Sequence, residues 1–419
     1  MFIKKSSINI IAKNILFFAI SKGVALLSPI FFIKFISLEQ YGLIEYSFAT
    51  GSVITVALLL GLGGAYPYFI LKKGETDKEQ AFFLYGALIL FLFVLFGCLY
   101  HISVLTRNIY FIFLFSAIFS LQRLYSLILR CNDKGYKAVL FDSGYYFILT
   151  ILILLCLVTN IHNPLQWLQY FMELYITGLI VDFIVHYKKH TNKPLSDVLK
   201  YDYPEILKYS VHLIISGLII YWLTSSARIY IKIFMGFEQI GIYSFYFRMV
   251  GISVALYQFC QITFFKKLYL SNPKRLDIYY AALMCTILIF CLISFTISPV
   301  FLKYLLPEGY ADMPKLFLLL CFQMPIWVGT ALCESLVARE NIIKRMYIGI
   351  GVMVVFFPLL LLILKEHLNL ELFTYLCILL FCISFAYQIY ILQKKNVPLK
   401  LCLIFNITTI VAVTIIYWT

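Results

Sequence analysis

Charged residues are scarce in this chain of 419 residues, and the short motifs of several enzyme classes are absent. Asp, Glu, Lys and Arg together make up 13% of the sequence, whereas 63% of the residues are hydrophobic. No G-x-x-x-x-G-K-[ST] sequence occurs, so a phosphate-binding loop for ATP is excluded. No H-E-x-x-H or C-x-x-C sequence occurs, so the common zinc and dithiol sites are excluded too. We therefore expect no enzyme, no metal site and no cofactor.

Long hydrophobic runs follow one another along almost the whole chain. A helix that crosses a bilayer needs roughly 20 apolar residues, and the composition is far more apolar than that of soluble proteins. The sequence therefore predicts an all-α polytopic membrane protein. A shorter apolar run at 401–418 is either a thirteenth span or a hairpin against the membrane. The twelve predicted spans are 8–36, 43–70, 80–104, 109–130, 138–159, 167–187, 206–234, 242–265, 278–302, 315–337, 346–364 and 372–392.

Lys and Arg are concentrated in alternate loops between the predicted spans. One set of loops carries basic clusters, among them "HYKKHTNKPLSDVLKYDYPEILK" between the sixth and seventh spans, and the other set carries only single basic residues. Basic loops stay on the cytoplasmic side of a membrane. We therefore expect a cytoplasmic N-terminus and an even number of spans up to Lys394.

Two similar stretches of sequence, both expected on the side of the membrane away from the cytoplasm, indicate an internal repeat. "FISLEQYGLIEYSF" begins at Phe35 and "FMGFEQIGIYSFYF" begins at Phe234, and each joins the first and second spans of one half of the chain. We expect Gly42 and Gly241 to take a positive φ in a tight turn. Because each half contains six spans, the halves form parallel repeats. The predicted parts are a six-helix lobe at 1–198, a second six-helix lobe at 199–392 and an extra hydrophobic segment at 393–419.

Two parallel six-helix halves with short loops resemble the multidrug/oligosaccharidyl-lipid/polysaccharide exporter superfamily, and within it the bacterial Wzx polysaccharide flippases. The local likeness lies in "NILFFAISKGVALLSPIFFIKFISLEQYG", in "SSARIYIKIFMGFEQIGIYSFYFRMVG" and, more weakly, in "ILRCNDKGYKAVLFD". Members often carry Asp-Arg in the seventh helix, whereas here Ala227 precedes Arg228. The role of that acid therefore does not carry over.

This resemblance implies two helical lobes around a central cavity that opens to either side of the membrane in turn. It implies a flippase that moves undecaprenyl-pyrophosphate-linked oligosaccharide across the bacterial inner membrane, for O-antigen or capsule synthesis. Membrane lipids and the polymerase and chain-length regulator of that pathway are the implied partners, with no nucleic acid. The alternative is a multidrug antiporter of the same superfamily, coupled to H⁺ or Na⁺.

Ionisable residues inside the predicted spans are the candidates for a site, because charge at membrane depth is costly and usually faces a cavity or a partner. A buried excess of cations favours an anionic substrate, whereas a drug antiporter would place carboxylates in its cavity. The expected anion- or pyrophosphate-binding residues are Lys22, Arg123, Arg228 and Arg248. The expected residues for a coupling ion or a counter-charge are Glu45, Asp142 and Glu173.

Three of these expectations are more specific. Arg228 and Arg248 flank the second turn, and both should lie roughly 10 Å below the outer helix ends. There they either bind pyrophosphate, which suits the planar guanidinium fork, or reach the interface separately. Asp142 and Arg123 are expected either to pair in a structural salt bridge or to serve the function. The tyrosines around the seventh and eighth spans either present hydroxyls to sugars or pack; these are Tyr221, Tyr230, Tyr243 and Tyr246.

Overall fold

The structure, a computed structural model, describes residues 5–59, 61–132, 134–159, 161–189, 194–258, 273–305, 313–340 and 342–419. These residues form helices and connecting turns, with no strand among them. Eight of the described helices are long and apolar enough to cross a membrane, or ten if each of two bent helix pairs counts as one span. The prediction of an all-α polytopic membrane protein is thereby confirmed. The twelve-helix, two-lobe layout stays a prediction.

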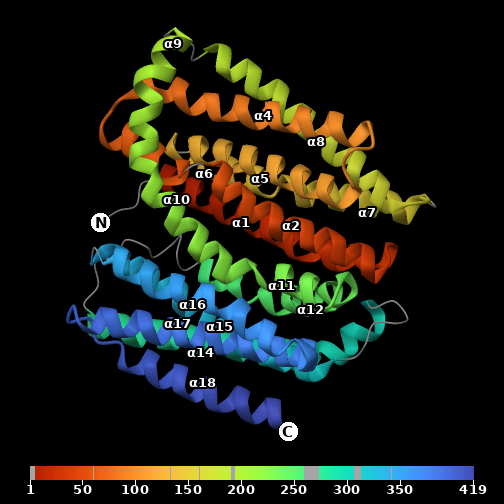
Figure 1. Ribbon diagram of the computed structural model, residues 1–419, viewed down its shortest axis with the longest axis vertical. Helices are drawn as coiled ribbons and strands as arrows, with labels where there is room; N and C mark the ends of the chain where they lie inside the picture. The colour runs from red at the N-terminus through yellow and green to blue at the C-terminus, as the bar shows by residue number, and fades with distance from the viewer. Residues whose placement is uncertain are drawn as a thin grey trace. The chain divides into compact units, whose positions relative to one another are not determined.

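The chain divides into two compact units, Met1–Tyr221 and Trp222–Thr419, which can be followed by colour and label in Figure 1. The boundary between them falls inside the predicted seventh span, and the predicted boundaries lie after residues 198 and 392. The helices of the first unit are α1 (Lys5–Phe32), α2 (Leu38–Leu58), α3 (Leu62–Tyr66), α4 (Glu79–His101), α5 (Arg107–Cys131), α6 (Gly135–Asp142), α7 (Gly144–Val158), α8 (Pro164–Lys189), α9 (Leu195–Asp197) and α10 (Tyr203–Ser225), the last of which continues past the boundary.

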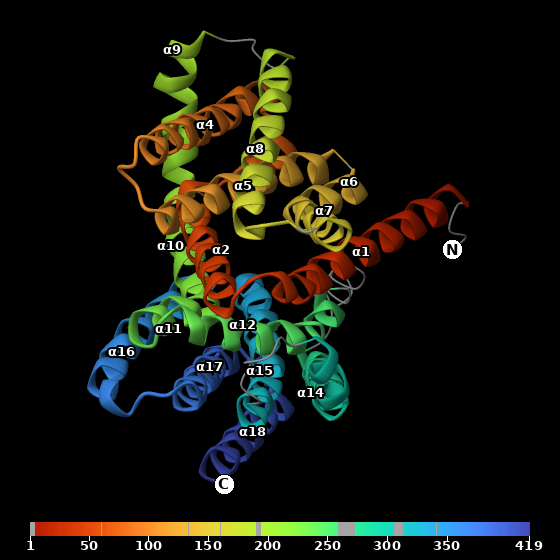
Figure 2. The ribbon, with the colours of Figure 1, turned by 90° about the vertical axis from the view of Figure 1, so that its right-hand side faces the viewer.

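Helix α5 is the centre of the first unit. It packs against α2, α4, α6 and α8, and Figure 2 shows α5 among these neighbours. Its contact with α2 is close because small residues meet there: a Cβ on Gly51 would lie 2.8 Å from the Cβ of Phe115. The hydroxyl of Thr55 donates a hydrogen bond of 3.2 Å to the carbonyl of Ser116 across the same contact. Small residues and interhelical hydrogen bonds are typical of helix contacts within membranes.

The predicted fifth span is bent. It consists of α6 and α7, whose axes differ by 53° across a short break. The break lies at Ser143 and Gly144, and a Gly/Ser pair is a common place for a helix to bend. Gly144 also lies against the Tyr175 side chain of α8, where a Cβ would come within 2.0 Å of the hydroxyl. The bend places Asp142, the last residue of α6, beside α5.

Each of the two similar turns leads into a helix at the same position of the repeat, but a different residue precedes the helix in each turn. Helices α2 and α12 (Phe237–Gly251) start at equivalent positions of the repeat, after Ser37 and Gly236 respectively. The Ser37 hydroxyl accepts from the backbone N–H of Gln40, and the Gln40 side chain accepts from the N–H of Ser37. Gly236 instead takes a φ of +96°. The expectation for Gly42 and Gly241 is wrong, because both lie inside helices and the residue before the second helix provides the positive φ.

The second unit is built around α15, which packs against α12, α14, α17 and α18. A Cβ on Gly329 of α15 would lie 2.7 Å from the Phe385 ring of α17 and 2.8 Å from the sulfur of Met284 of α14, so these helices also approach closely. Besides α12, the described helices of this unit are α11 (Ala227–Phe234), α14 (Pro273–Leu305), α15 (Pro314–Arg339), α16 (Ile343–Ile363), α17 (Leu370–Gln393) and α18 (Lys400–Trp418).

The closing hydrophobic run forms the single helix α18, with no reversal inside it. Its 19 residues extend about 28 Å at 1.5 Å per residue, which is long enough to cross the hydrocarbon core of a bilayer. The carboxylate of Asp277 in α14 accepts from the N–H groups of Leu401 and Cys402, at 2.9 and 3.1 Å. A carboxylate that satisfies N–H groups in the first turn stabilises the start of a helix, so Asp277 fixes where α18 begins.

Candidate functional site

A cavity of about 650 Å³ lies within the first unit. Its walls come from α2, α5, α6, α7 and α10, and most of the surface is apolar. The charged side chains on its walls are two arginines of α5, Arg123 and Arg130, and the carboxylate of Asp142. Cavities of this size are typical of small-ligand sites, in which a few polar groups set orientation. The cavity is therefore the best candidate site in the part of the chain that the structure describes.

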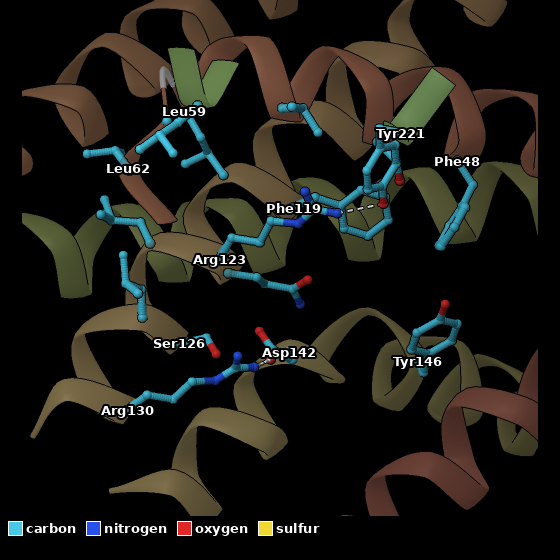
Figure 3. A pocket seen from close by; sticks show the side chains of 17 residues that line it. Phe48, Leu59, Leu62, Phe119, Arg123, Ser126, Arg130, Asp142, Tyr146 and Tyr221 are labelled. Carbon is cyan, nitrogen blue, oxygen red and sulfur yellow. Dashed lines mark hydrogen bonds and ion pairs between the residues drawn. The ribbon is translucent and has the colours of Figure 1, made fainter. Parts of the chain in front are cut away.

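Arg123 points across the cavity to α10. Its Nη2 atom donates to the hydroxyl of Tyr221 at 2.7 Å, and its guanidinium carbon lies 5.1 Å from the centre of the Tyr221 ring. Figure 3 shows this pair on one side of the cavity. A guanidinium carries five N–H donors, so one hydroxyl leaves most of them available to a ligand.

Arg130 lies two helical turns after Arg123 on the same helix, about 10.5 Å along the axis, and pairs with Asp142. Figure 3 shows Arg130 pointing to Asp142, with Ser126 beside the pair. The side chains of Arg130 and Asp142 are 59% and 33% exposed. The expected pairing of Asp142 with Arg123 is wrong, because the bend after α6 brings the carboxylate to Arg130.

Lys22 of α1 is a third cation near this pair. It interacts electrostatically with both Asp142 and Arg130, and its ammonium lies 5.7 Å from the centre of the Phe18 ring. Lys22 and Arg123 were predicted from the sequence as anion-binding residues and Asp142 as a counter-charge, and the structure gathers them in one region of the first unit. Arg130 was not predicted, because it stands next to a basic loop; its spacing of seven residues from Arg123 was the available signal.

The two predicted glutamates lie elsewhere in the first unit. Glu45 of α2 is buried, with 1% of its surface exposed, and it is not among the residues that line the cavity. Glu173 of α8 accepts hydrogen bonds from the hydroxyl of Tyr110 at 3.0 Å and from the amide of Gln169 at 2.9 Å. The ring of Tyr110 in turn stacks on that of Tyr100, with 4.1 Å between centroids. Glu173 therefore joins α8 to α5 through a neutral donor, and ring stacking extends the contact to α4.

Arg228 and Arg248 belong to the second unit. Arg228 is 9% exposed; its Nε atom donates to the Ser244 hydroxyl at 2.8 Å, and its guanidinium lies 5.0 Å from the centre of the Phe247 ring. It therefore connects α11 to α12 across the second turn. Arg248 is half-buried on α12. That they share an anion site stays a prediction.

The four predicted tyrosines separate into one that lines the cavity and three that are enclosed. Tyr221 lines the cavity. The other three are at most 5% exposed. Tyr230 accepts from the indole N–H of Trp222 at 2.8 Å, and Tyr246 accepts from the N–H of Met313 at 3.2 Å. Packing therefore accounts for Tyr230, Tyr243 and Tyr246.

A second hollow of about 490 Å³ lies beside α10, and Leu213 lines both hollows. At its rim Lys73 and Lys78 form ion pairs with Glu75 and Glu205, which connect the loop after α3 to the start of α10. The hydrogen bond to Glu205 raises the pKa of Lys73 above its ordinary value, so the pair stays ionised at neutral pH. This ion cluster at the start of α10 and the Arg123–Tyr221 hydrogen bond farther along it connect α10 to other helices of the first unit.

The geometry of the cavity suits an anionic group that accepts hydrogen bonds. Two guanidinium forks project from one helix, and such forks bind phosphate oxygens through parallel charge-assisted hydrogen bonds. In comparisons with known proteins, the sequence matches no family model and no curated protein, and the structure matches no solved structure.

Proposed function

We propose that the protein is a flippase that moves undecaprenyl-pyrophosphate-linked oligosaccharide across the bacterial inner membrane, for O-antigen or capsular polysaccharide synthesis. The observation that carries the proposal is the cavity of the first unit, which is lined by two arginines and one carboxylate and has a lysine near that carboxylate. Cations at membrane depth are costly unless they face water, a partner or a ligand. A lipid-linked pyrophosphate supplies such a ligand.

The charge of the cavity supports an anionic substrate over a cationic drug. An antiporter for cations would be expected to present an excess of carboxylates. Among the residues that the structure describes, Asp142 is the one carboxylate that lines this cavity, and it is paired with Arg130. The size of the cavity, about 650 Å³, suits a pyrophosphate with an adjoining sugar. The polyprenyl chain would stay in the lipid, so the protein need enclose only the polar part of the substrate.

The experiment that tests this proposal is deletion of the gene in its host, followed by analysis of lipid-linked sugars and of surface polysaccharide. We expect lipid-linked oligosaccharide to accumulate on the cytoplasmic leaflet and surface polysaccharide to disappear. Re-expression of the wild-type chain should restore both. As a matched control, Lys34→Ala should restore them equally well, because Lys34 is an exposed cation outside the cavity. Normal surface polysaccharide combined with new drug sensitivity in the deletion strain would instead support an antiporter.

A further inference from the structure

The Arg130–Asp142 pair inside the cavity raises the question of why a proposed anion site contains its own anion. A carboxylate close to a guanidinium lowers the affinity of that guanidinium for any other anion, because the incoming anion must displace or approach a like charge. A site selected only for tight binding would have no acid at this position. Asp142 lines the same cavity as Arg123 and Arg130, so its cost to anion binding is direct.

Exposure makes the Arg130–Asp142 pair exchangeable. With 59% and 33% of the two side chains exposed, water replaces much of the interaction when the pair opens, and exposed ion pairs contribute only about 0–1 kcal/mol. A pyrophosphate diester carries one negative charge on each phosphorus. It can therefore occupy the Arg130 fork in place of the carboxylate while its second phosphate binds Arg123, two turns away on the same helix.

The surroundings of Asp142 allow it to leave Arg130 without becoming isolated. Lys22 interacts electrostatically with Asp142 as well as with Arg130. When a ligand binds Arg130, Lys22 remains near the Asp142 carboxylate. When the ligand leaves, Asp142 pairs with Arg130 again. Three cations and one carboxylate leave an excess of two positive charges, which equals the two negative charges of a pyrophosphate diester.

We infer that Asp142 is a displaceable internal counter-anion, a positioning residue that holds Arg130 in the empty site, weakens the hold on the bound pyrophosphate diester and so permits its release. This inference rests on the proposed function and assigns Asp142 and Arg130 roles within that site. A purely structural role for Asp142 has a different consequence, because loss of a structural acid lowers both the affinity for the pyrophosphate diester and the rate of transport. Loss of a competing counter-anion raises affinity and lowers transport.

The test compares affinity and transport for Asp142→Asn, which keeps the shape of the side chain and removes its charge. The full chain in lipid nanodiscs is titrated calorimetrically with P1,P2-dimethyl pyrophosphate, a soluble pyrophosphate diester, and with dimethyl phosphate, which carries one charge. We expect Asp142→Asn to bind the pyrophosphate diester roughly tenfold more tightly, with a smaller gain for dimethyl phosphate, because the Coulomb term scales with ligand charge. Surface polysaccharide in cells that carry this variant should fall.

Two further variants keep the test decisive. Arg130→Gln should weaken binding, and adding Asp142→Asn to it should restore much less affinity than Asp142→Asn adds alone, because the acid acts through Arg130. Asp182→Asn, which removes an acid on α8 that does not line the cavity, should leave affinity unchanged. Circular dichroism and melting temperature verify that each variant is folded.

The possible outcomes separate the inference from the proposed function. Wild-type protein that binds the pyrophosphate diester, with Asp142→Asn binding it no more tightly, overturns the inference and leaves the flippase proposal standing. Wild-type protein that binds neither probe at low salt overturns both. Tighter binding by Asp142→Asn with undiminished surface polysaccharide shows that release does not depend on Asp142, and this also overturns the inference.

Discussion

Arg123 of the first unit and Arg228 of the second both lie within predicted spans but have different surroundings. Arg123 of the first unit lines a cavity and binds a single hydroxyl, while Arg130 on the same helix is more than half exposed. Arg228 of the second unit is 9% exposed and is held between a serine hydroxyl and a phenylalanine ring. Charged residues of predicted spans therefore occupy two kinds of position, the wall of a cavity and an enclosed contact between helices, and the neighbours distinguish them.

The largest expected effect is on transport, through the first unit. Arg123→Gln should reduce surface polysaccharide more than tenfold, because a neutral amide cannot replace the charged fork that binds phosphate. Protein level and melting temperature should stay close to wild type, since the partner that Arg123 loses, Tyr221, lies at a cavity wall. Quantitative immunoblotting of surface glycan and of the protein provides the measurement. Normal export by Arg123→Gln would remove Arg123 from the site.

Helix packing offers the next contrast, between Gly51 of the first unit and Gly329 of the second. Gly51→Ala should lower stability by about 1–3 kcal/mol, since its Cβ would meet the Phe115 Cβ and backbone atoms of α5, which cannot move independently. Gly329→Ala should cost less, because it meets the ends of the Phe385 and Met284 side chains, which can rotate away. The melting temperatures of the two variants and of the wild type, measured in detergent, test this difference.

Gly23→Ala is the control for both glycine variants, because its Cβ would meet no atom within 4 Å. Its melting temperature should equal or exceed that of wild type, as alanine favours helix. Equal losses at Gly51 and Gly329 would show that the two contacts relax to the same extent.

Because Arg228 connects α11 to α12, its replacement should lower stability by as much as the Gly51→Ala substitution or by less. Arg228→Gln removes the hydrogen bond to Ser244 and the contact with Phe247, and we expect a loss of about 1–3 kcal/mol, the range for leaving a buried polar partner unsatisfied. Export per molecule of folded protein should change little. If Arg228→Gln instead abolishes export at unchanged melting temperature, the anion site predicted for the second unit from the sequence is the correct one.

The two similar turns should give one effect of comparable size, at Gly236, and the smallest expected effect, at Ser37. Gly236→Ala should cost about 1–3 kcal/mol, because a φ of +96° with a ψ of −178° is accessible almost only to glycine. Ser37→Ala should cost about 1 kcal/mol through loss of the helix cap. Gly236→Asn should cost about as much as Gly236→Ala, because asparagine tolerates positive φ mainly in the left-handed helical region and not at a ψ near 180°. A Ser37→Ala loss that exceeds the Gly236→Ala loss would contradict the assignment of the two caps.

The positions of many helices could be predicted from hydropathy, because a long apolar segment that lies in the membrane has to be helical. A backbone in lipid must satisfy its hydrogen bonds within the segment, so long apolar runs become helices, and the predicted spans at 80–104 and 372–392 correspond to α4 and α17 within a few residues. The bend after Asp142 was not predictable from hydropathy, because hydropathy shows where apolar residues lie along the chain and not the direction of the helix axis on either side of Ser143. The pairing of Asp142 therefore could not be predicted correctly.

The sequence by itself determined the helical class, Arg123 and Asp142 as candidate site residues and the equivalent starts of α2 and α12, because these depend on local pattern. Tertiary structure alone decided which charges meet. Arg123 reaches Tyr221 across nearly one hundred residues, and Asp142 reaches Arg130 only through the 53° bend between α6 and α7. Electrostatic interactions between side chains weaken with distance and strengthen with burial, and both quantities follow from the packing of the helices.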